Sequence, residues 1–303
     1  MNLNQLKLFY LTARYKSHSK AAESLNISQP AVTIGINRLE DHCDVKLFQR
    51  DGRTMALTEA GDELFKLAEK IFETELLAED CIRNFQAKNE QRIQIHASET
   101  FGAYYLPALI NRFNGLYPKA SLLVDIMLSD QVIENTIGIR NDIGFISYPI
   151  ENDKLLIREV IEDTLVVILS PGHPLAAKAC IKPTDLEKQV IIMHEKGSAI
   201  RKALLSFIEK DKIQITTPIQ YSNNEAIKRA VELKTGVALI SRLVADKEIK
   251  RGELKAVPLS DSSIGRKFYL IHHKDKYIFK LLKDFIATMK VWAEDYGIAV
   301  EAR

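Results

Sequence analysis

The fold of the N-terminal part of this chain is decided by the segment Ser28-Gln29-Pro30-Ala31-Val32-Thr33-Ile34-Gly35-Ile36-Asn37-Arg38-Leu39-Glu40. Ser28 can cap a helix, and Pro30 fits its first turn, where backbone N–H groups have no partner within the helix. At 100° per residue, one narrow stripe holds Val32, Ile36, Leu39 and Cys43. The other side, which we expect to face a partner, carries Pro30, Thr33, Ile34, Asn37 and Arg38, with Gln29 at its edge.

The residues before this segment predict two further helices. Apolar residues recur at helical spacing over residues 3–15, and Ser17 can cap a short helix over residues 18–25. Asn26, which tolerates left-handed geometry, and Ile27 predict a tight turn into Ser28. Two short helices joined by such a turn, the second polar on its outer face, indicate a helix-turn-helix whose second helix reads DNA.

A β-hairpin is predicted directly after these helices. Residues 46–49 and 54–57 flank Arg50-Asp51-Gly52-Arg53, in which Asp-Gly is a strong signal for a two-residue turn. Arg50 and Arg53 could reach phosphates or a minor groove from this wing. The alternative is that they only solvate a surface hairpin, but a position directly after a helix-turn-helix favours contact with DNA.

A long helix is predicted from Thr58, its cap, to about Lys88. It would be about 45 Å long at 1.5 Å per residue, with apolar residues at three- and four-residue steps. The alternative, packing against its own chain, is less favoured because the DNA-binding head is too small to cover it. We therefore expect this helix to form a homodimer.

Composition bounds the class of protein. A chain of 303 residues, 46% hydrophobic and 27% charged, predicts a globular protein of two or three domains. The apolar runs are too short to span a bilayer, and nothing at the N-terminus resembles an export signal, so we expect a cytoplasmic protein with no membrane partner. Three scattered cysteines argue against a disulfide framework or a zinc site.

The charges change sign along the chain, although the net charge is only +2. Residues 1–57 hold eight basic and five acidic residues, whereas residues 58–88 hold four basic and eight acidic ones. This pattern is expected if only the head meets phosphate.

Strands and helices alternate beyond Asn89. Apolar patterns predict strands over residues 92–97, 120–127, 142–148, 164–170, 190–194, 237–241 and 267–272. Helices are predicted over residues 103–116, 130–139, 198–209, 223–234 and 277–296. The alternation indicates an α/β unit, with two lobes expected. Ligands of such sheets bind beside the carboxyl ends of strands and the N-termini of helices.

Polar residues at these positions are candidates for an effector site. They are Ser98, Thr100, Ser129, Ser147, Ser198, Arg201 and Asn223. Each one alone is most simply a helix cap. Together they could line one cleft, in which Arg201 supplies a fixed charge and hydroxyl and N–H groups hold a small polar or anionic ligand.

Signatures of enzymes and of metal or cofactor sites are missing. The chain has no GxxxxGK[ST], GxGxxG or GxSxG motif, and the segment from His194 ends in Ser198 where a HExxH zinc helix would have its second histidine. We expect no catalytic residue, no metal and no cofactor.

The head resembles the winged helix-turn-helix of LysR-type transcriptional regulators. The matching residues are Phe9, Ser17, Ala21-Ala22, Leu25, Ser28-Gln29-Pro30-Ala31-Val32-Thr33, Leu39-Glu40, Leu47-Phe48-Gln49-Arg50, Arg53 and Leu57-Thr58-Glu59-Ala60-Gly61. Weaker matches follow in Pro171-Gly172-His173-Pro174-Leu175, Glu195 to Arg201, Val231 to Ile240 and Gly252-Glu253-Leu254, so the resemblance covers nearly the whole chain.

The resemblance implies a domain organisation. Residues 1–57 would form the winged helix-turn-helix, residues 58–89 the linker and dimerisation helix, and residues 91–303 a two-lobed effector domain like that of periplasmic solute-binding proteins. Lobe I would comprise residues 91–162 and 267–303, and lobe II residues 163–266, with a small-molecule effector between them. Members of the family commonly assemble as homotetramers that bend DNA.

The sequence departs from the family pattern at three places. Cys43-Asp44 replaces the usual Leu-Gly after the reading helix, and Gly35 interrupts that helix at a cost near 1 kcal/mol relative to Ala. Ile34, Gly35 and Asn37 are expected to help set the surface offered to bases. Ala199-Ile200 replaces a frequent Gly-Thr before Arg201, which removes a hydroxyl from the expected ligand site.

The sequence therefore predicts an effector-controlled transcriptional regulator of double-stranded DNA, not an enzyme. Base edges are assigned to Gln29, Thr33 and Asn37, apolar contacts to Pro30 and Ile34, and phosphate or groove contacts to Arg38, Arg50 and Arg53. The alternatives are a solute-binding protein, which should carry an export signal and no DNA-binding head, and an enzyme on the same scaffold, which needs a nucleophile with a base or a metal cluster.

Overall fold

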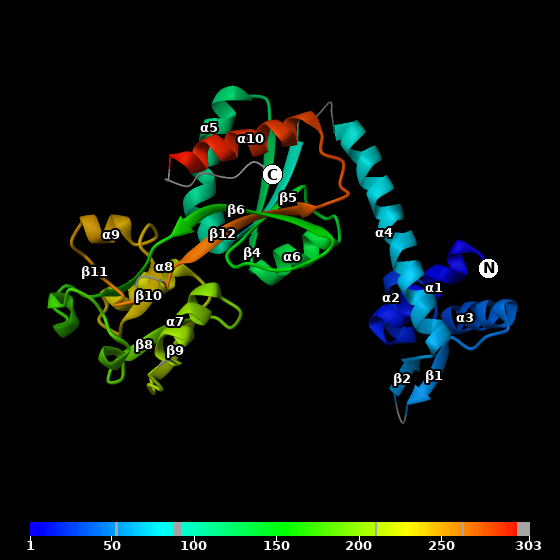
Figure 1. Cartoon of the computed structure of the whole chain (residues 1–303), viewed down its shortest axis with the longest axis horizontal. Coiled ribbons are helices and arrows are strands. Elements are labelled where there is room, and N and C mark those ends of the chain that lie inside the picture. The colour runs from blue at the N-terminus through cyan, green and yellow to red at the C-terminus, as the bar shows by residue number, and fades with distance from the viewer. Residues whose placement is uncertain (52–53, 88–91, 210, 262–263, 296–303) are drawn as a thin grey trace. The chain divides into compact units, whose positions relative to one another are not determined.

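The computed structural model describes residues 1–51, 54–87, 92–209, 211–261 and 264–295. The chain divides into two compact units, Met1–Asp80 and Cys81–Arg303, each of which is described by itself (Figure 1). Within the described ranges, none of the helices combines the length and the apolarity that crossing a membrane requires.

The first unit begins with three helices, α1 (Leu3–Tyr15), α2 (His18–Leu25) and α3 (Gln29–Cys43). The predicted caps are confirmed: the side chain of Ser17 accepts a hydrogen bond from Lys20 N, and that of Ser28 accepts one from Ala31 N. Each helix ends at a residue in the left-handed region, namely Lys16, Asn26 and Asp44, with φ between 50° and 53°. Asp44 thus makes the turn for which the family pattern has Gly.

The core of this unit lies under the inner face of α3. Val32, Ile36 and Leu39 are buried there, as predicted, and Leu39 packs with Phe9 of α1. The prediction is wrong for Cys43, which is exposed at the last residue of the helix. The stripe therefore ends one turn before the helix does.

A hairpin follows, built from β1 (Phe48–Asp51) and β2 (Thr54–Leu57) in antiparallel register. The strand that we predicted over residues 46–49 starts two residues later, at Phe48, and the backbone N–H group of Leu47 donates to the carboxylate of Glu40 and not to a strand. The register pairs Asp51 with Thr54.

The long helix α4 runs over Glu59–Ala87. The hydroxyl of Thr58 accepts a hydrogen bond from Gly61 N and donates one to Lys46 O, so the same residue caps α4 and ties it to the segment before the hairpin. Ala68 and Phe72 are buried against the head.

The second unit opens with a five-stranded sheet in the order β4-β3-β5-β12-β6. Its strands are β3 (Arg92–Ser98), β4 (Ser121–Met127), β5 (Ile143–Ile146), β6 (Leu155–Asp163) and β12 (Arg266–His273). Helices α5 (Leu106–Leu116) and α10 (Lys280–Glu294) cover one face, and α6 (Ser129–Ile137) covers the other (Figure 1). Alternation along β5 produces both faces: Phe145 packs in the α5 and α10 cluster, Ile146 in that of α6.

A second sheet forms the other lobe. It comprises β10-β7-β11 and the parallel pair β8-β9. An isolated parallel bridge between Ile191 of β8 and Val237, directly before β10, connects the two parts. The strands are β7 (Leu165–Leu169), β8 (Val190–His194), β9 (Thr216–Tyr221), β10 (Ala238–Ser241) and β11 (Lys255–Pro258). Helices α7 (Ala199–Glu209) and α8 (Asn224–Glu232) pack on its two faces, and a short α9 (Asp246–Lys250) precedes β11.

Several features of this unit were not predicted. Strands β6, β9 and β11 lie outside the predicted strands; β9, for example, is largely exposed and shows no apolar alternation. The helix predicted over residues 103–116 starts earlier, as a π-helical turn over Phe101–Tyr105 that leads into α5. Two short 3-10 helices, Pro174–Ala177 and Pro183–Leu186, follow β7.

The chain passes between the two sheets at two points that lie close together. It leaves the first sheet at Asp163, the last residue of β6, and β7 begins after a single residue. It returns at Arg266, the first residue of β12. The side chains of these two residues form an ion pair, with 2.7 Å between Arg266 Nε and Asp163 Oδ2.

Candidate functional site

The outer face of α3 is a candidate surface for nucleic acid. Gln29, Pro30, Asn37 and Arg38 are exposed, and Ile34 is 51% exposed. Thr33 is half-buried, and its hydroxyl donates to Gln29 O. The face presents hydroxyl, amide, guanidinium and methyl groups, which are the groups that read base edges and phosphates.

The side chain of Gln29 is held in place by α2. The hydroxyl of Ser19 donates to Gln29 Oε1 over 3.3 Å, and both residues are exposed. This hydrogen bond fixes the orientation of the Gln29 amide. A base contact through Gln29 Nε2 would therefore cost less side-chain conformational entropy.

Gly35 does not contribute to this face as expected. A Cβ atom built on Gly35 would lie 2.2 Å from Leu8 Cδ1, so the residue faces α1. Its missing side chain lets α1 and α3 approach closely, and the expectation that it helps to set the surface offered to bases is wrong. Of the two wing arginines, Arg53 lies outside the described residues, and only the backbone of Arg50 is described, in β1.

Glu40 fixes the start of the hairpin relative to α3. Its carboxylate is buried and accepts hydrogen bonds from Leu47 N over 2.8 Å and Phe48 N over 3.3 Å, and it pairs with Lys46 Nζ at 2.7 Å. Desolvation by burial raises the pKa of Glu40, but these hydrogen bonds and the Lys46 charge outweigh it and hold the pKa below its ordinary value. The carboxylate is therefore ionised at neutral pH.

The second unit contains a cavity of about 400 Å³ between its two sheets. Five of the predicted effector residues line it, namely Ser98, Thr100, Ser129, Ser147 and Ser198. The hydroxyls of Ser129 and Ser147 lie 3.1 Å apart, and Ser147 N donates to the Ser129 oxygen. These residues come from four segments of the chain and meet at one site, next to the first turns of α6 and α7.

Two of the predicted residues do not line this cavity. Arg201 donates from Nη1 to His194 O and to Gln220 Oε1, at 3.0 and 2.8 Å. The side chain of Asn223 accepts from Ala226 N over 2.8 Å and caps α8. Arg201 therefore braces β8 and β9, and Asn223 performs the capping role that we weighed as the alternative.

The cavity also holds four residues that the sequence did not single out for this role: Glu99, His194, Glu195 and Arg266. Burial lowers the pKa of His194 to about 4, so its ring is neutral at pH 7. Because Leu239 O can only accept, His194 Nε2 carries the proton that bridges their 3.2 Å separation. Burial raises the pKa of Glu99, although a hydrogen bond from Asn224 N opposes this effect. The sequence signal for Arg266 is slight: it is one of two adjacent cations, Arg266-Lys267, at the start of an apolar strand.

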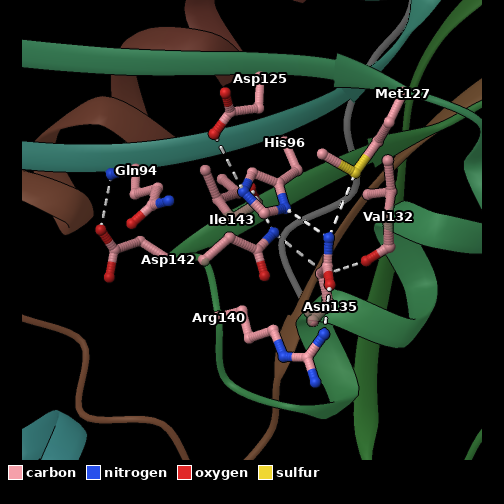
Figure 2. A network of polar contacts seen from close by, with 11 residues as sticks. Gln94, His96, Asp125, Met127, Val132, Asn135, Arg140, Asp142 and Ile143 are labelled. Atoms are coloured by element: carbon pink, nitrogen blue, oxygen red, sulfur yellow. Dashed lines mark hydrogen bonds and ion pairs between the residues drawn. The ribbon is translucent and has the colours of Figure 1, made fainter.

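A polar network supports the wall of the cavity that α6 forms (Figure 2). Asn135 Nδ2 donates to the sulfur of Met127 and lies 3.3 Å from His96 Nδ1, while Arg140 Nη1 donates to Asn135 Oδ1. His96 Nε2 lies 3.4 Å from Asp125 Oδ2. Since Met127 lines the cavity, this network fixes α6 and the end of β4 beside the site.

Comparison with known proteins agrees with this architecture. Residues 3–62 match the family model described as "Bacterial regulatory helix-turn-helix protein, lysR family", and residues 86–293 match "LysR substrate binding domain". A probable RuBisCO transcriptional regulator of Cyanidium caldarium is 32% identical over 294 residues, which cover 93% of this chain and 91% of the relative.

Two solved structures are similar in fold. The regulatory domain of Synechocystis PCC6803 CcmR in complex with 2-PG has a TM-score of 0.63 and 25% identity, and the alignment covers 67% of this chain and 98% of that one. Full-length CbnR complexed with its target DNA has a TM-score of 0.57 and 19% identity, and the alignment covers 97% of this chain and 100% of that one.

A winged helix-turn-helix followed by a two-lobed α/β unit with a polar cavity defines a DNA-binding transcriptional regulator that a small molecule controls, and not an enzyme. The family is shown by the two models, which together match most of the chain, and by the level of identity to the relative. The chain belongs to the LysR family of transcriptional regulators.

Proposed function

We propose that this protein reads an operator through the outer face of α3 and alters transcription when a small effector occupies the cavity between its lobes. The observation that carries the proposal is that α3 buries Val32, Ile36 and Leu39 while it exposes amide, guanidinium and apolar groups on its other side. A helix with one face in a core and a polar face free can enter a major groove.

The roles of the individual residues follow from their chemistry. Gln29, Thr33 and Asn37 contact base edges, and Pro30 and Ile34 contact apolar groups such as a thymine methyl. Arg38, Arg50 and Arg53 contact phosphates or a groove. In the cavity, Ser98, Thr100, Ser129, Ser147 and Ser198 contact a polar or anionic effector. Arg201 and Asn223 act behind the wall, where they hold β8 and the start of α8.

The domain limits that we assign are residues 1–57 for DNA binding, 58–89 for the linker helix and 91–303 for effector binding, with lobe I at 91–162 and 267–303 and lobe II at 163–266. The linker helix pairs two copies of the chain. Exposed apolar side chains along α4 support this pairing, with exposed fractions of 58% for Leu67, 42% for Ile71 and 39% for Leu76. Two dimers assemble as a tetramer in the cytoplasm and bind two DNA sites.

A gel-shift salt series tests the DNA-binding roles, with an operator fragment selected from a random pool by the wild-type chain. Gln29→Ala should weaken binding to this fragment about tenfold and leave nonspecific binding intact, because a good base contact contributes about 1–3 kcal/mol. Arg53→Ala should weaken both kinds of binding and reduce the salt slope by about one.

Arg251→Ala, which removes an exposed arginine from the second unit, is the matched control and should change neither quantity. If Gln29→Ala bound the selected fragment as tightly as the wild type, the assignment of α3 as the reading helix would be wrong.

A further inference from the structure

The charges in the cavity are mixed. Among the described residues that line it, the charged side chains are Arg266, Glu99 and Glu195. His194 is neutral because burial lowers its pKa to about 4. Arg266 is only 9% exposed, whereas Glu99 and Glu195 are half-buried. The cavity therefore offers one deep cation and two carboxylates closer to solvent.

The guanidinium of Arg266 is held in place, but the described residues do not occupy all of its hydrogen-bond donors. Its Nε donates to Asp163 Oδ2 over 2.7 Å, and its guanidinium lies over the ring of Phe268, 4.8 Å from the centroid. Its Nη2 is buried and has no hydrogen-bond partner in the described part of the chain. Arg266 lines the cavity, and a buried donor on a charged group is costly to leave unpaired, so an oxygen acceptor bound beside this side chain would be favoured.

Hydroxyl groups line the same cavity as Arg266. Ser98 Oγ is also buried without a partner among the described residues, and it lines the same cavity as Ser129 and Ser147. A guanidinium nitrogen and several hydroxyl donors match the two oxygens of a carboxylate.

A ligand that is only anionic does not fit the rest of the cavity. Asp163, 1% exposed, already pairs with the Arg266 charge, so an added anion meets Glu99 and Glu195 without a free counter-charge. Like charges at short range in a partly desolvated site repel each other strongly. Glu99 is influenced by both neighbours, since Arg266 lowers its pKa while Glu195 raises it, in a balance that burial dominates.

We propose that the effector is a zwitterion of the α-amino acid type. Its carboxylate binds Arg266 and the serine hydroxyls, and its ammonium group lies between Glu99 and Glu195. This inference rests on the proposed function, because it takes the cavity as the effector site. A volume of about 400 Å³ accommodates a side chain beyond the two charged groups.

Calorimetry with the full-length chain tests this inference. The probes are the twenty common amino acids, the 2-hydroxy acid and the decarboxylated amine that correspond to each one that binds, 2-PG and inorganic phosphate. At least one amino acid should bind, and at least tenfold more tightly than its hydroxy acid, its amine, 2-PG and phosphate.

Variants separate the two charged contacts. Glu195→Gln should weaken binding of the amino acid at least tenfold without weakening binding of the hydroxy acid, because only the amino acid carries the ammonium group. Arg266→Gln should weaken both. Since Arg266→Gln leaves Asp163 buried and unpaired, the double variant Asp163→Asn/Arg266→Gln repeats the test with a neutral pair.

Lys202→Ala is the matched control. Lys202 lies over the ring of Tyr148 and lines a neighbouring cavity of about 420 Å³ that shares Arg266, but it does not line the first cavity. It should not change the affinity for the amino acid.

Three results would overturn the inference: no amino acid binds, an anionic probe binds more tightly than every amino acid, or Lys202→Ala abolishes binding that Glu195→Gln leaves intact. If only the inference about the effector is wrong, specific operator binding in the gel shift is still observed. Failure of the inference that the effector is a zwitterion can thus be distinguished from failure of the proposed regulatory function, which would appear as loss of specific DNA binding.

Discussion

Glu40 provides the sharpest test of how the reading helix positions the wing. The residue ends the buried stripe of α3, and its carboxylate accepts from the backbone N–H groups of Leu47 and Phe48, where the hairpin begins. Both bonds go to Oε1, so Glu40→Ala removes the acceptor of the two hydrogen bonds at once. Leu47 is 3% exposed, so its N–H group cannot turn to solvent.

The cost can be worked from these contacts. An unpaired buried N–H group costs about 1–3 kcal/mol, and the longer bond to Phe48 adds less. Lys46 contributes little because it is 70% exposed. We expect Glu40→Ala to destabilise the start of the hairpin by about 2 kcal/mol, and Glu40→Gln, which keeps an oxygen acceptor, by about half as much.

Hydrogen exchange of the full-length chain measures this effect locally. A loss of about 2 kcal/mol corresponds to roughly thirtyfold faster exchange in peptides that cover residues 44–58, at 1.4 kcal/mol per factor of ten. Asp41→Ala removes the same charge from the neighbouring exposed residue and should leave exchange unchanged.

The effect should hold from neutral pH down to about 4.5, the ordinary pKa of a glutamate. The folded chain holds the pKa of Glu40 below this value, so its contribution is lost only as the pH falls further, through the folded pKa. Equal exchange in wild type and Glu40→Ala at pH 7 would refute the account of Glu40 as the link between α3 and the wing.

Two further predictions concern the cavity and the linker helix. Because burial lowers the pKa of His194 from 6.5 to about 4, the stability that its neutral ring contributes is complete above pH 6.5 and is lost as the pH falls toward 4. Between pH 7.5 and 5, the free energy of unfolding measured with urea should therefore fall by about 2 kcal/mol less in His194→Gln than in the wild type. Ile71→Asp, on the exposed apolar side of α4, should convert a dimer into a monomer in sedimentation at micromolar concentration, while Leu233→Asp, at a residue 70% exposed in the second unit, should not. A monomeric wild type would refute pairing through α4.

The head could be predicted almost residue by residue because its signals are local. Ser17 and Ser28 cap helices from within the same turn, and the stripe of Val32, Ile36 and Leu39 repeats along one element. The role of Gly35 could not be predicted, since it depends on Leu8 in another helix. The start of the hairpin was misplaced for the same reason, because Glu40 takes its N–H groups from seven and eight residues away.

The candidate cavity was predictable in its hydroxyl groups and not in its charges. Ser98, Ser129 and Ser147 stand where strands end or helices begin, and the geometry of α/β sheets brings such positions together. Arg201 has a similar place in the sequence, but its guanidinium turns to His194 O and Gln220. Arg266 gives no comparable signal, because its partner Asp163 is 103 residues away.

The position of Arg266 explains how a ligand in the cavity could act on the relation between the lobes. Asp163 and Arg266 stand where the chain passes between the two sheets, and Asp163 Oδ1 also accepts from Tyr105 OH over 2.9 Å and from Ser241 Oγ over 2.7 Å. Tyr105 belongs to the first lobe and Ser241 to the second, so one buried carboxylate joins both lobes and Arg266, which lines the cavity. A ligand shifts a conformational equilibrium only by binding its states unequally. A change in the angle between the lobes would alter the distances from Tyr105 and Ser241 to Asp163, and a ligand bound to Arg266 would then favour the arrangement that keeps Arg266 in place.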